Sequence, residues 1–508
     1  MEELGFPLGV RLTHWFNVLF LTLLARSGLA ILAAHPKLYW NMHARPGSAW
    51  LNLLGRKLPT DRMWCSTDEE ATWPGWMVLP SGEGLGLGRY WHFLDAFCWL
   101  VVGLFYLLVL FTSPQWQRLV PTSWEIFPCA GRTMLEYLKF GTPEPTERAF
   151  CYAPGYLPFN SLQQLTYFGF IFFLVPFQIA TGIAQSPSIL ARFPWYGRIF
   201  GNRQAARSLH FLGLAAIGSF LVIHLIMVFW HNFAKEMDKM VLGIAQPEGS
   251  WLGVLLGISI IVAIVLLHFL ANHFSHTARH RVHVILAALV GPIREGLLHN
   301  LISVQDRSEQ DISPYFRTNG YPPISAYPQA QGDDDTYERL LDNRFADYRL
   351  EVRGLVEKEH AFSLEELRSL PKQEQTTMHN CIQGWTSVGR WGGVPLRDIL
   401  DRCKVLPNAR YLVFTSFAKH EKSDKIYYEC VSLDLARHPQ TILAYELNGQ
   451  ELPIQSGAPL RVRLETKLGF KMVKFLRSVD VVEDYHVIGA GMGGVREDEQ
   501  QYDMGAEI

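Results

Sequence analysis

The stretch LHFLGLAAIGSFLVIHLIMVFW, residues 209–230, is apolar apart from Ser219 and two histidines, His210 and His224. At about 1.5 Å per residue, the spacing of these histidines corresponds to roughly 21 Å along one helix. At about 100° per residue, both return to nearly the same face. Because imidazoles are costly inside hydrocarbon, a matched pair at opposite membrane depths predicts two ligands. One helix of this kind can hold two stacked haems, which indicates a transmembrane electron carrier.

The N-terminal half contains further stretches that approach the length needed to cross a bilayer. The five predicted spans are His14–Ala34, Trp91–Phe111, Leu162–Ala184, Leu209–Trp230 and Leu252–Ala271. Pro176 predicts a kink in the third span. Residues 1–10 carry acidic side chains and no basic ones, so we expect no cleavable signal peptide. The N-terminal half is therefore expected to fold as an all-α transmembrane bundle of about five helices.

The composition changes toward the C-terminus. From about Asp306 the sequence is charged and consists of short alternating segments, which is typical of a soluble domain. We expect a transmembrane domain over residues 1–275, an interfacial helix and linker over 276–345, a soluble domain over 346–490 and a tail over 491–508. The helix is predicted at Val282–Leu301. The net charge of −2 gives no electrostatic case for nucleic acid.

Four histidines sort by membrane depth into two pairs. His14 and His224 lie toward the N-terminal surface, and His92 and His210 lie toward the opposite surface. Each pair predicts an iron with two imidazole ligands, which suits electron transfer because no axial position stays open. Single histidines at membrane ends are often ordinary interfacial residues, but depth matching of all four favours ligands. The histidines after the fifth span are predicted to face headgroups rather than to hold a third haem.

The N-terminal half carries motifs that point to a family. They are the run RLTHW at residues 11–15, the segment 167–182 that ends in Ala-Thr-Gly, and the spacing of His210 and His224. Together they resemble the cytochrome b561 superfamily, in the branch of the di-haem b-type subunits of hydrogenases and formate dehydrogenases. The resemblance implies two haem b groups, electron exchange with membrane quinone or quinol, and a place in a respiratory chain.

The soluble half carries a second set of motifs around the sequence MHNCIQGW, residues 378–385. Downstream come His438-Pro439, AYELNG at 444–449, GAPLR at 457–461 and LGFKMVK at 468–474. In this order they resemble the α+β sulfite oxidase fold of mononuclear molybdenum enzymes, which includes the methionine sulfoxide reductase subunit, over residues 349–484. The seven cysteines of the chain show no CxxC pair, so neither a zinc site nor an iron–sulfur cluster is indicated.

The second resemblance implies roles for several residues of the soluble domain. Cys381 would be the thiolate ligand of molybdenum, beside the sulfurs of a molybdopterin. Gly469, Lys471 and Lys474 would bind the pterin phosphate through close backbone approach and positive charge. Tyr427 matches an active-site tyrosine of sulfite oxidases, although Tyr428 is adjacent.

Other residues near these motifs have weaker assignments. His379 and Asn380 flank the metal cysteine and are expected to donate hydrogen bonds around it. Arg461 and Arg463 either reach an anionic ligand or lie on a strand surface. At position 383 the sequence has a glutamine where the methionine sulfoxide reductase type has a glutamate, and an amide cannot take up a proton as a carboxylate can. The oxo-substrate therefore stays open.

Five spans place the soluble domain on the surface opposite the N-terminus. The loop between spans three and four carries Arg192, Arg198, Arg203 and Arg207, which favours a cytoplasmic soluble domain. A disulfide between Cys129 and Cys151 would fit an oxidising compartment on the other side. The haem subunits that the chain resembles usually keep their N-termini inside, which favours the periplasmic alternative.

These observations predict a multi-pass protein of the bacterial inner membrane, in contact with lipid. We expect a molybdenum-dependent oxidoreductase that passes electrons through two haems between quinone and a site of oxygen-atom transfer, by sulfoxide or N-oxide reduction or by sulfite-like oxidation. The alternative is a haem-only electron carrier or reductase with a non-catalytic C-terminal binding module. A homodimer is compatible with either.

Overall fold

The computed structural model of the protein describes residues 6–55, 57, 64–82, 84–141, 159–244, 248–298, 302–332, 334–500 and 502. Its contacts divide the chain into two compact units. Unit 1 comprises Met1–Ser27, Trp91–Ile183 and Leu209–Thr277. Unit 2 comprises Gly28–Tyr90, Ala184–Ser208 and Ala278–Ile508. The units therefore do not follow the boundaries expected from composition, because two segments of the N-terminal half pack with the soluble half.

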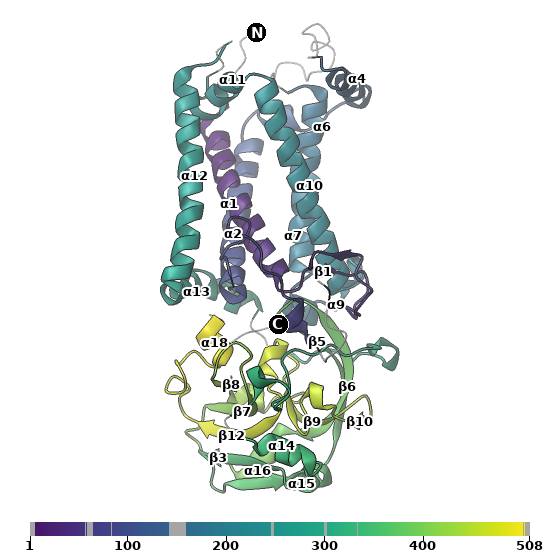
Figure 1. The fold of residues 1–508 in the computed structure, drawn as a ribbon. Coiled ribbons are helices and arrows are strands. Elements are labelled where there is room, and N and C mark those ends of the chain that lie inside the picture. Colours follow the sequence, from purple (N-terminus) through teal and green to yellow (C-terminus); the bar gives the residue numbers. More distant parts are fainter. Residues whose placement is uncertain are drawn as a thin grey trace. The chain divides into compact units, whose positions relative to one another are not determined.

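Five helical segments of the described chain are long and apolar enough to cross a membrane, which confirms the predicted bundle. They are α1 (Leu8–Ala33), α2 (Leu85–Phe111), the segment Ser161–Ile183, α10 (Arg203–Trp230) and α12 (Trp251–Thr277). Figure 1 shows α1, α2, α10 and α12 as long helices whose axes are roughly aligned. Many of their leucine, isoleucine and phenylalanine side chains are exposed, as lipid-facing side chains are. The chain is a membrane protein.

The third span is interrupted one turn earlier than the predicted kink. It consists of α6 (Ser161–Gly169), a π-helical turn at Phe170–Leu174 and α7 (Val175–Ile183). The π-helical turn lies directly before Pro176, where a proline removes the backbone donor of an α-helix. The irregularity is therefore a widened turn at residues 170–174.

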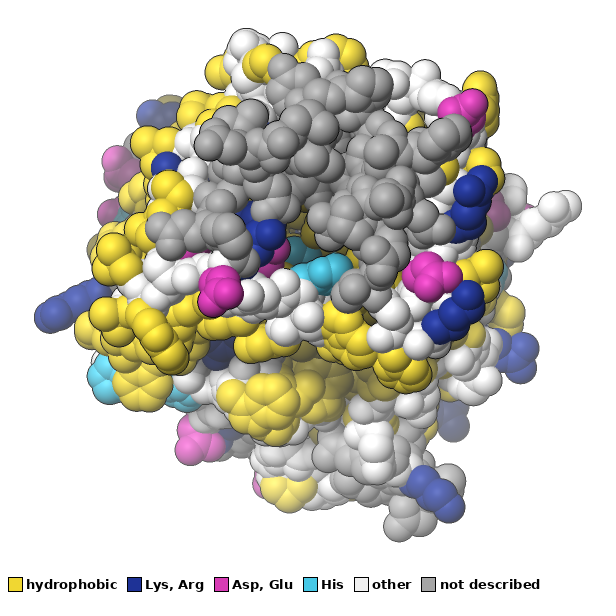
Figure 2. All heavy atoms as spheres, turned by 90° about the horizontal axis from the view of Figure 1, so that it is seen from above, with side chains coloured by type: hydrophobic (Ala, Val, Ile, Leu, Met, Phe, Trp, Pro, Cys, Tyr) yellow, Lys and Arg dark blue, Asp and Glu magenta, His cyan; other side chains and the backbone are white. Residues whose placement is uncertain are grey.

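Short helices close one end of unit 1. They are α3 (Trp116–Leu119), α4 (Ile126–Leu138), α11 (Phe233–Met237) and the π-helical turn Asp238–Leu242. The indole of Trp15 on α1 donates to the carbonyl of Met240, 3.1 Å away. Viewed from the end at which α1 begins, hydrophobic side chains occupy much of the rim, and histidine side chains are visible in a hollow (Figure 2).

The C-terminal half of unit 2 contains two five-stranded sheets, which confirms the α+β expectation. In the first sheet the strand order is β10-β9-β6-β5, with β11 also paired to β9. In the second it is β4-β3-β12-β7-β8, where only β3 and β12 run parallel. The strands are β3 (Arg349–Gly354), β4 (His360–Ser363), β5 (Gln373–Asn380), β6 (Thr386–Pro395), β7 (Tyr411–Lys419), β8 (Ile426–Ser432), β9 (Ile442–Leu447), β10 (Gln450–Glu451), β11 (Arg461–Arg463) and β12 (Leu476–Val482).

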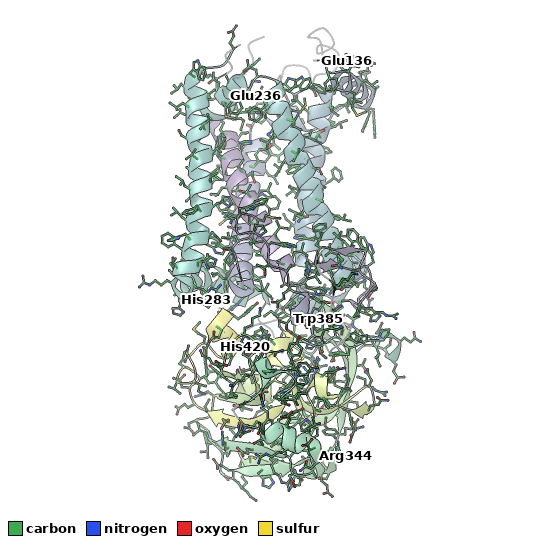
Figure 3. All side chains as sticks on the ribbon, viewed as in Figure 1. Glu136, Glu236, His283, Arg344, Trp385 and His420 are labelled. Atoms are coloured by element: carbon green, nitrogen blue, oxygen red, sulfur yellow. The ribbon has the colours of Figure 1, made fainter. Side chains whose placement is uncertain are left out.

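An apolar core drawn from both sheets holds this half of unit 2 together. Leu350, Phe414, Val462 and Leu476 are among its fully buried members. The helices of this half are α14 (Thr336–Asp342), α15 (Leu364–Ser369), α16 (Leu396–Cys403), α17 (Leu433–Ala436) and α18 (Val495–Gln500). Trp385 and His420 lie at one end of the sheets, and Arg344 lies near the other end (Figure 3). The end with Trp385 and His420 carries the candidate site.

Segments of the N-terminal half complete unit 2. They form β1 (Lys37–Leu38), β2 (Leu51–Asn52), the 3-10 turn Ser66–Glu69, α8 (Pro187–Arg192) and α9 (Pro194–Ile199). Helix α13 (Arg279–Leu298) occurs close to the predicted interfacial helix. A buried ion-pair cluster holds these segments in place, since Glu69 binds both Lys37 and Arg317 with no exposed carboxylate surface. Both charges of the Glu69–Arg317 pair are buried within unit 2.

Candidate functional site

The four predicted haem histidines meet in the two predicted pairs in unit 1. The ring centroids of His14 and His224 are 6.4 Å apart, and those of His92 and His210 are 6.5 Å apart. Two imidazoles bound on opposite sides of one metal ion, with bonds of about 2 Å each, place their ligating nitrogens about 4 Å apart. The centroid distances fit such a sandwich, so the residues present fit a haem iron at each pair.

Hydroxyl groups orient the ring of two of these histidines. Ser27 donates its proton to the carbonyl of Leu23, 2.9 Å away, so its oxygen accepts from Nδ1 of His92 at 3.1 Å. Thr181 likewise donates to the carbonyl of Phe177 at 2.9 Å, and its oxygen lies 3.1 Å from Nδ1 of His210. A proton held on Nδ1 leaves Nε2 free to bind iron.

Two more residues of the third span contact the haem histidines. Tyr167 Oη lies 3.2 Å from Nδ1 of His224, and Gln178 Nε2 lies 3.3 Å from Nε2 of His210. A Cβ at Gly182 would lie 3.2 Å from the His210 ring. The Ala-Thr-Gly motif therefore positions the His210 ring through the hydroxyl of Thr181, and Gly182 leaves space for that ring. Sequence reasoning found the motif and missed these roles.

Unit 2 contains a cavity that is partly open to solvent. Six residues singled out in the sequence line it, namely His379, Cys381, Tyr427, Arg461, Gly469 and Lys474. Arg317, Glu421 and Arg496 also line it and were not foreseen. Four other residues that the sequence singled out lie within two positions of a lining residue but do not line the cavity themselves. They are Asn380, Lys471, Arg463 and Tyr428. The cavity brings together residues that are more than a hundred positions apart.

Cys381 begins a tight turn between β5 and β6. Its amide donates to the carbonyl of Trp385 at 3.1 Å, and Gly384 adopts a φ of 105°, which favours glycine. The carbonyl of Gly384 accepts from Arg203 at 3.0 Å and from Gln204 at 2.8 Å. The first turn of α10 therefore clamps the turn that carries the cysteine.

The Cys381 side chain is suited to bind a soft metal. Burial raises the pKa of its thiol to about 12, so the group holds its proton when no metal is bound. A buried thiol of this kind loses its proton as a metal ion binds. Soft thiolates suit metals that are also bound by dithiolene sulfurs.

His379 is buried against Gly469. A Cβ at position 469 would lie 2.2 Å from the ring, so only glycine admits the histidine there. Arg463 donates to Nδ1 of His379 at 2.9 Å, which leaves the proton of a neutral ring on Nε2. Burial, with the charges of Arg463 and Arg461, lowers the pKa of His379 well below its usual value. The missing side chain at Gly469 therefore makes room for the His379 ring, whereas the sequence predicted that it makes room for the pterin phosphate.

Two cations of the cavity wall, Lys474 and Arg461, donate to backbone carbonyls and have no carboxylate partner among the described residues. Lys474 donates to Gly320 and Gln455 at 3.1 Å each, and Arg461 donates to Ser456 at 2.8 Å. The Nε atom of Arg461 has no hydrogen-bond partner within the described residues. Burial, and then the charge of Arg461, lowers the pKa of Lys474 to about 7. A bound phosphate would supply the missing negative charge, so this wall fits the phosphate of a molybdopterin.

Lys471 lies in a different environment from the one predicted. Its ammonium lies 2.7 Å from Glu429 and also binds Glu497, and all three side chains are fully buried. These carboxylates raise the pKa of Lys471, although burial acts in the opposite direction. The charge is already balanced, and it anchors α18 to β8. The structure therefore gives Lys471 a structural role and leaves Lys474 as the lysine of the cavity.

The two adjacent tyrosines also differ in position. Tyr427 donates to the carbonyl of Phe470 at 2.8 Å and lines the cavity, and burial raises its pKa well above the usual value. Tyr428 instead binds Asp498 and a carbonyl at Ile488. Since strand neighbours point to opposite faces, only one of the two can face the cavity. That residue is Tyr427.

Comparisons with known proteins divide the chain in the same way. Residues 5–243 match the family model of the prokaryotic cytochrome b561, and residues 339–487 match that of the oxidoreductase molybdopterin binding domain. Residues 244–338 lie outside both matches. The sequence motifs therefore predicted the same two families that these models match.

Several known proteins are similar to parts of the chain. A putative protein-methionine-sulfoxide reductase subunit YedZ1 of Azospira oryzae is 38% identical over 32% of this chain and 57% of its own length. The protein-methionine-sulfoxide reductase catalytic subunit MsrP of Xanthomonas campestris is 34% identical over 28% of this chain and 46% of its own. The chain thus spans about half the length of these relatives. The sulfane dehydrogenase SoxCD of Paracoccus pantotrophus is 23% identical over 31% of this chain and 41% of that chain, with a TM-score of 0.26.

Proposed function

We propose that this membrane oxidoreductase, which joins a cytochrome b561 domain to a molybdopterin-binding domain, transfers electrons between membrane quinone and an oxo-substrate. The substrate class we infer is a sulfoxide. Two of the relatives that match the chain are named protein-methionine-sulfoxide reductase subunits. Position 383 of this chain is a glutamine rather than a glutamate. Reduction of one sulfoxide consumes two electrons and two protons and yields a thioether and water.

The observation that carries the proposal is the cavity of unit 2. A buried cysteine faces the same space as two cations that lack a carboxylate partner among the described residues. Molybdopterin bound there would supply oxygen-atom transfer at the metal. Cys381 would hold the metal, Lys474 and Arg461 would hold the phosphate, and Tyr427 would donate a hydrogen bond within the cavity. Exclusion of water by this buried wall strengthens each of these contacts.

The test follows the haems of the purified full chain after chemical reduction. Metal analysis should find molybdenum bound to the protein. Addition of a methionine sulfoxide should then reoxidise the haems, and an N-oxide serves as the comparison for other oxo-substrates that accept electrons. Sulfite donates electrons, so it is tested on the oxidised protein by whether it reduces the haems. A protein without molybdenum, or haems that no oxo-compound reoxidises, would overturn the proposal. In that case the chain would be the haem-only carrier.

We also propose two haems per chain. Each histidine pair has a ring separation suited to one iron, and hydroxyl partners orient His92 and His210. Histidine ligation at both irons supports electron transfer within unit 1 rather than oxygen chemistry.

A polar cluster between α1 and α12 is our candidate for the quinol headgroup. Thr22 Oγ1 lies 2.9 Å from Nε2 of His268, and Arg26 Nη1 lies 2.9 Å from Nδ1 of the same ring. All three side chains are partly exposed on helices that span the membrane. Polar groups at this depth are costly when they face hydrocarbon, so they mark functional positions. Oxidation of one quinol there would release two protons and pass two electrons to the haems.

The molybdopterin domain is proposed to lie on the cytoplasmic side. Five spans separate it from the N-terminal surface, and the loop between spans three and four is rich in arginine. Cys129 is disulfide-bonded, which supports an oxidising compartment at the N-terminal surface. Its predicted partner, Cys151, lies outside the described residues. Labelling of a cysteine introduced near Arg344, in intact cells and in lysed cells, tests this orientation.

A further inference from the structure

The segment Ser66–Glu70 of the cytochrome half contacts the wall of the cavity. It follows α1, precedes α2 and belongs to unit 2. Glu69 is fully buried and binds Arg317, which lines the cavity. Burial alone would raise the pKa of Glu69, but His35 and Arg317 hold it well below its usual range. This carboxylate is therefore a fixed negative charge behind the cavity wall.

Glu70, the next residue, joins two loops that frame the cavity. Its Oε1 accepts from Gln383 at 2.7 Å, and its Oε2 accepts from Lys422 at 2.7 Å. Gln383 belongs to the turn of Cys381, and Lys422 follows Glu421, which lines the cavity. The carboxylate that joins these two loops therefore comes from the segment Ser66–Glu70.

The contact also sets the orientation of the Gln383 amide. A carboxylate only accepts hydrogen bonds, so the NH₂ group of Gln383 must point toward Glu70. The same NH₂ group donates to the carbonyl of Ser66 at 3.3 Å. The amide oxygen then faces the other way, where it accepts from Trp385 at 2.9 Å and from the Cys381 sulfur at 3.7 Å. Glu70, Ser66 and Trp385 thus all favour the same orientation, and Glu70 accepts the shorter of the two hydrogen bonds from the NH₂ group.

We propose that Glu70 is a positioning residue of the molybdopterin site, an inference that rests on the proposed function. Position 383 itself holds an amide, and the carboxylate of this pair stands at position 70. The sulfur faces a neutral amide oriented by Glu70, and the negative charge lies one side chain farther away. Coulomb interactions weaken with distance. The surroundings of the metal thiolate are therefore less negative than they would be with a carboxylate at position 383 itself.

The first test is Glu70→Gln in the full chain. Molybdenum content and haem spectra should match the parent, because Cys381, Lys474 and the histidines are unchanged. The Mo(V) electron paramagnetic resonance signal should shift, and haem reoxidation by sulfoxide should slow by about 10- to 100-fold, as for other changes next to a metal ligand. The reciprocal variant E70Q/Q383E keeps one amide and one carboxylate in contact, and it should restore the rate.

The matched control is Glu446→Gln. Glu446 pairs with Lys372 at 3.0 Å on the outer surface of β9 and does not line the cavity. Its loss should leave the signal and the rate unchanged. A parental signal and rate in E70Q would overturn the inference, and so would a loss of molybdenum that the reciprocal variant fails to restore. Turnover that survives Cys381→Ser would instead overturn the proposed function, so the two failures are distinguishable.

Discussion

The histidine pairs of unit 1 and the cavity of unit 2 both bury polar groups, but they are built differently. In unit 1, three helices supply four histidines. Two of these histidines are each oriented by a hydroxyl group, from Ser27 or Thr181, which itself donates to a backbone carbonyl one helical turn away. In unit 2, strands, loops and a helix between residues 316 and 496 form the cavity wall. Helical periodicity places the first set, whereas long-range packing places the second. Substitutions in the two regions should therefore fail in different ways.

Cys381→Ser should have the largest effect. Loss of the thiolate should abolish turnover of the oxo-substrate and reduce bound molybdenum, because an alcohol is a poor ligand for a soft site. The haem spectra should stay intact, since the histidines belong to unit 1. Activity assays beside visible spectra measure both. Simultaneous loss of haem and molybdenum would show that the two regions depend on each other to fold.

Replacement of either histidine of α10 should remove one haem and spare the other. His210→Leu should leave the pair of His14 and His224 intact, and His224→Leu should leave the pair of His92 and His210 intact. Haem content per chain should fall by half in each variant, as measured by pyridine haemochrome spectra. We expect H210L to block electron flow to the molybdopterin site and H224L to block only exchange at the far surface. Loss of both haems in either variant would contradict separate sites.

The variants Lys474→Met and Lys471→Met distinguish a lysine that binds the cofactor from a lysine that stabilises the fold. K474M removes a cation of the cavity, so cofactor content should fall by about 10- to 100-fold at limiting cofactor, with little change in folding. K471M leaves Glu429 and Glu497 buried without their cation, which should cost about 3–5 kcal/mol of stability. Cofactor analysis and thermal unfolding of the detergent-solubilised chain measure the two effects. The reverse pattern would restore Lys471 as the predicted phosphate ligand.

His268→Leu tests the quinol site. Reduction of the haems by a quinol should slow by about tenfold, which is the effect of losing about 1.4 kcal/mol of transition-state stabilisation. Reduction by dithionite should be unchanged, because the four haem histidines remain. Stopped-flow spectra at the haem absorption bands measure both rates. Equal slowing with the two reductants would indicate a structural defect of α12.

A smaller effect concerns pH and Lys474. Its pKa is about 7 in the folded, cofactor-free protein and about 10.5 in an unfolded chain. Between these values the unfolded chain binds more protons, so stability should rise with pH across this window, and the full penalty should remain below pH 7. The melting temperature of cofactor-free protein should therefore be higher at pH 8.5 than at pH 6.5. The K474M variant should lose part of this dependence. An unchanged slope in K474M would show that other groups cause it.

The sequence was informative where local periodicity carries the function. Five apolar spans and the spacing of His210 and His224 predicted the bundle and both histidine pairs. Motif order predicted that Cys381, His379, Tyr427, Gly469 and Lys474 belong to one site, and all of them line the cavity. It did not distinguish Lys471 from Lys474, because two lysines in one run look alike until their partners are known. The partners, Glu429 and Glu497, come from distant segments.

The chain order alone therefore determined two domains, their families and the residues from which the redox sites are built. Only the tertiary structure decided how the domains share segments. Glu69 and Glu70 lie in a loop between two membrane helices, and nothing in their local sequence shows that they pair with Arg317 and Gln383. Helix periodicity is a property of neighbouring residues, whereas a buried charge takes its role from whichever side chain packing brings to it.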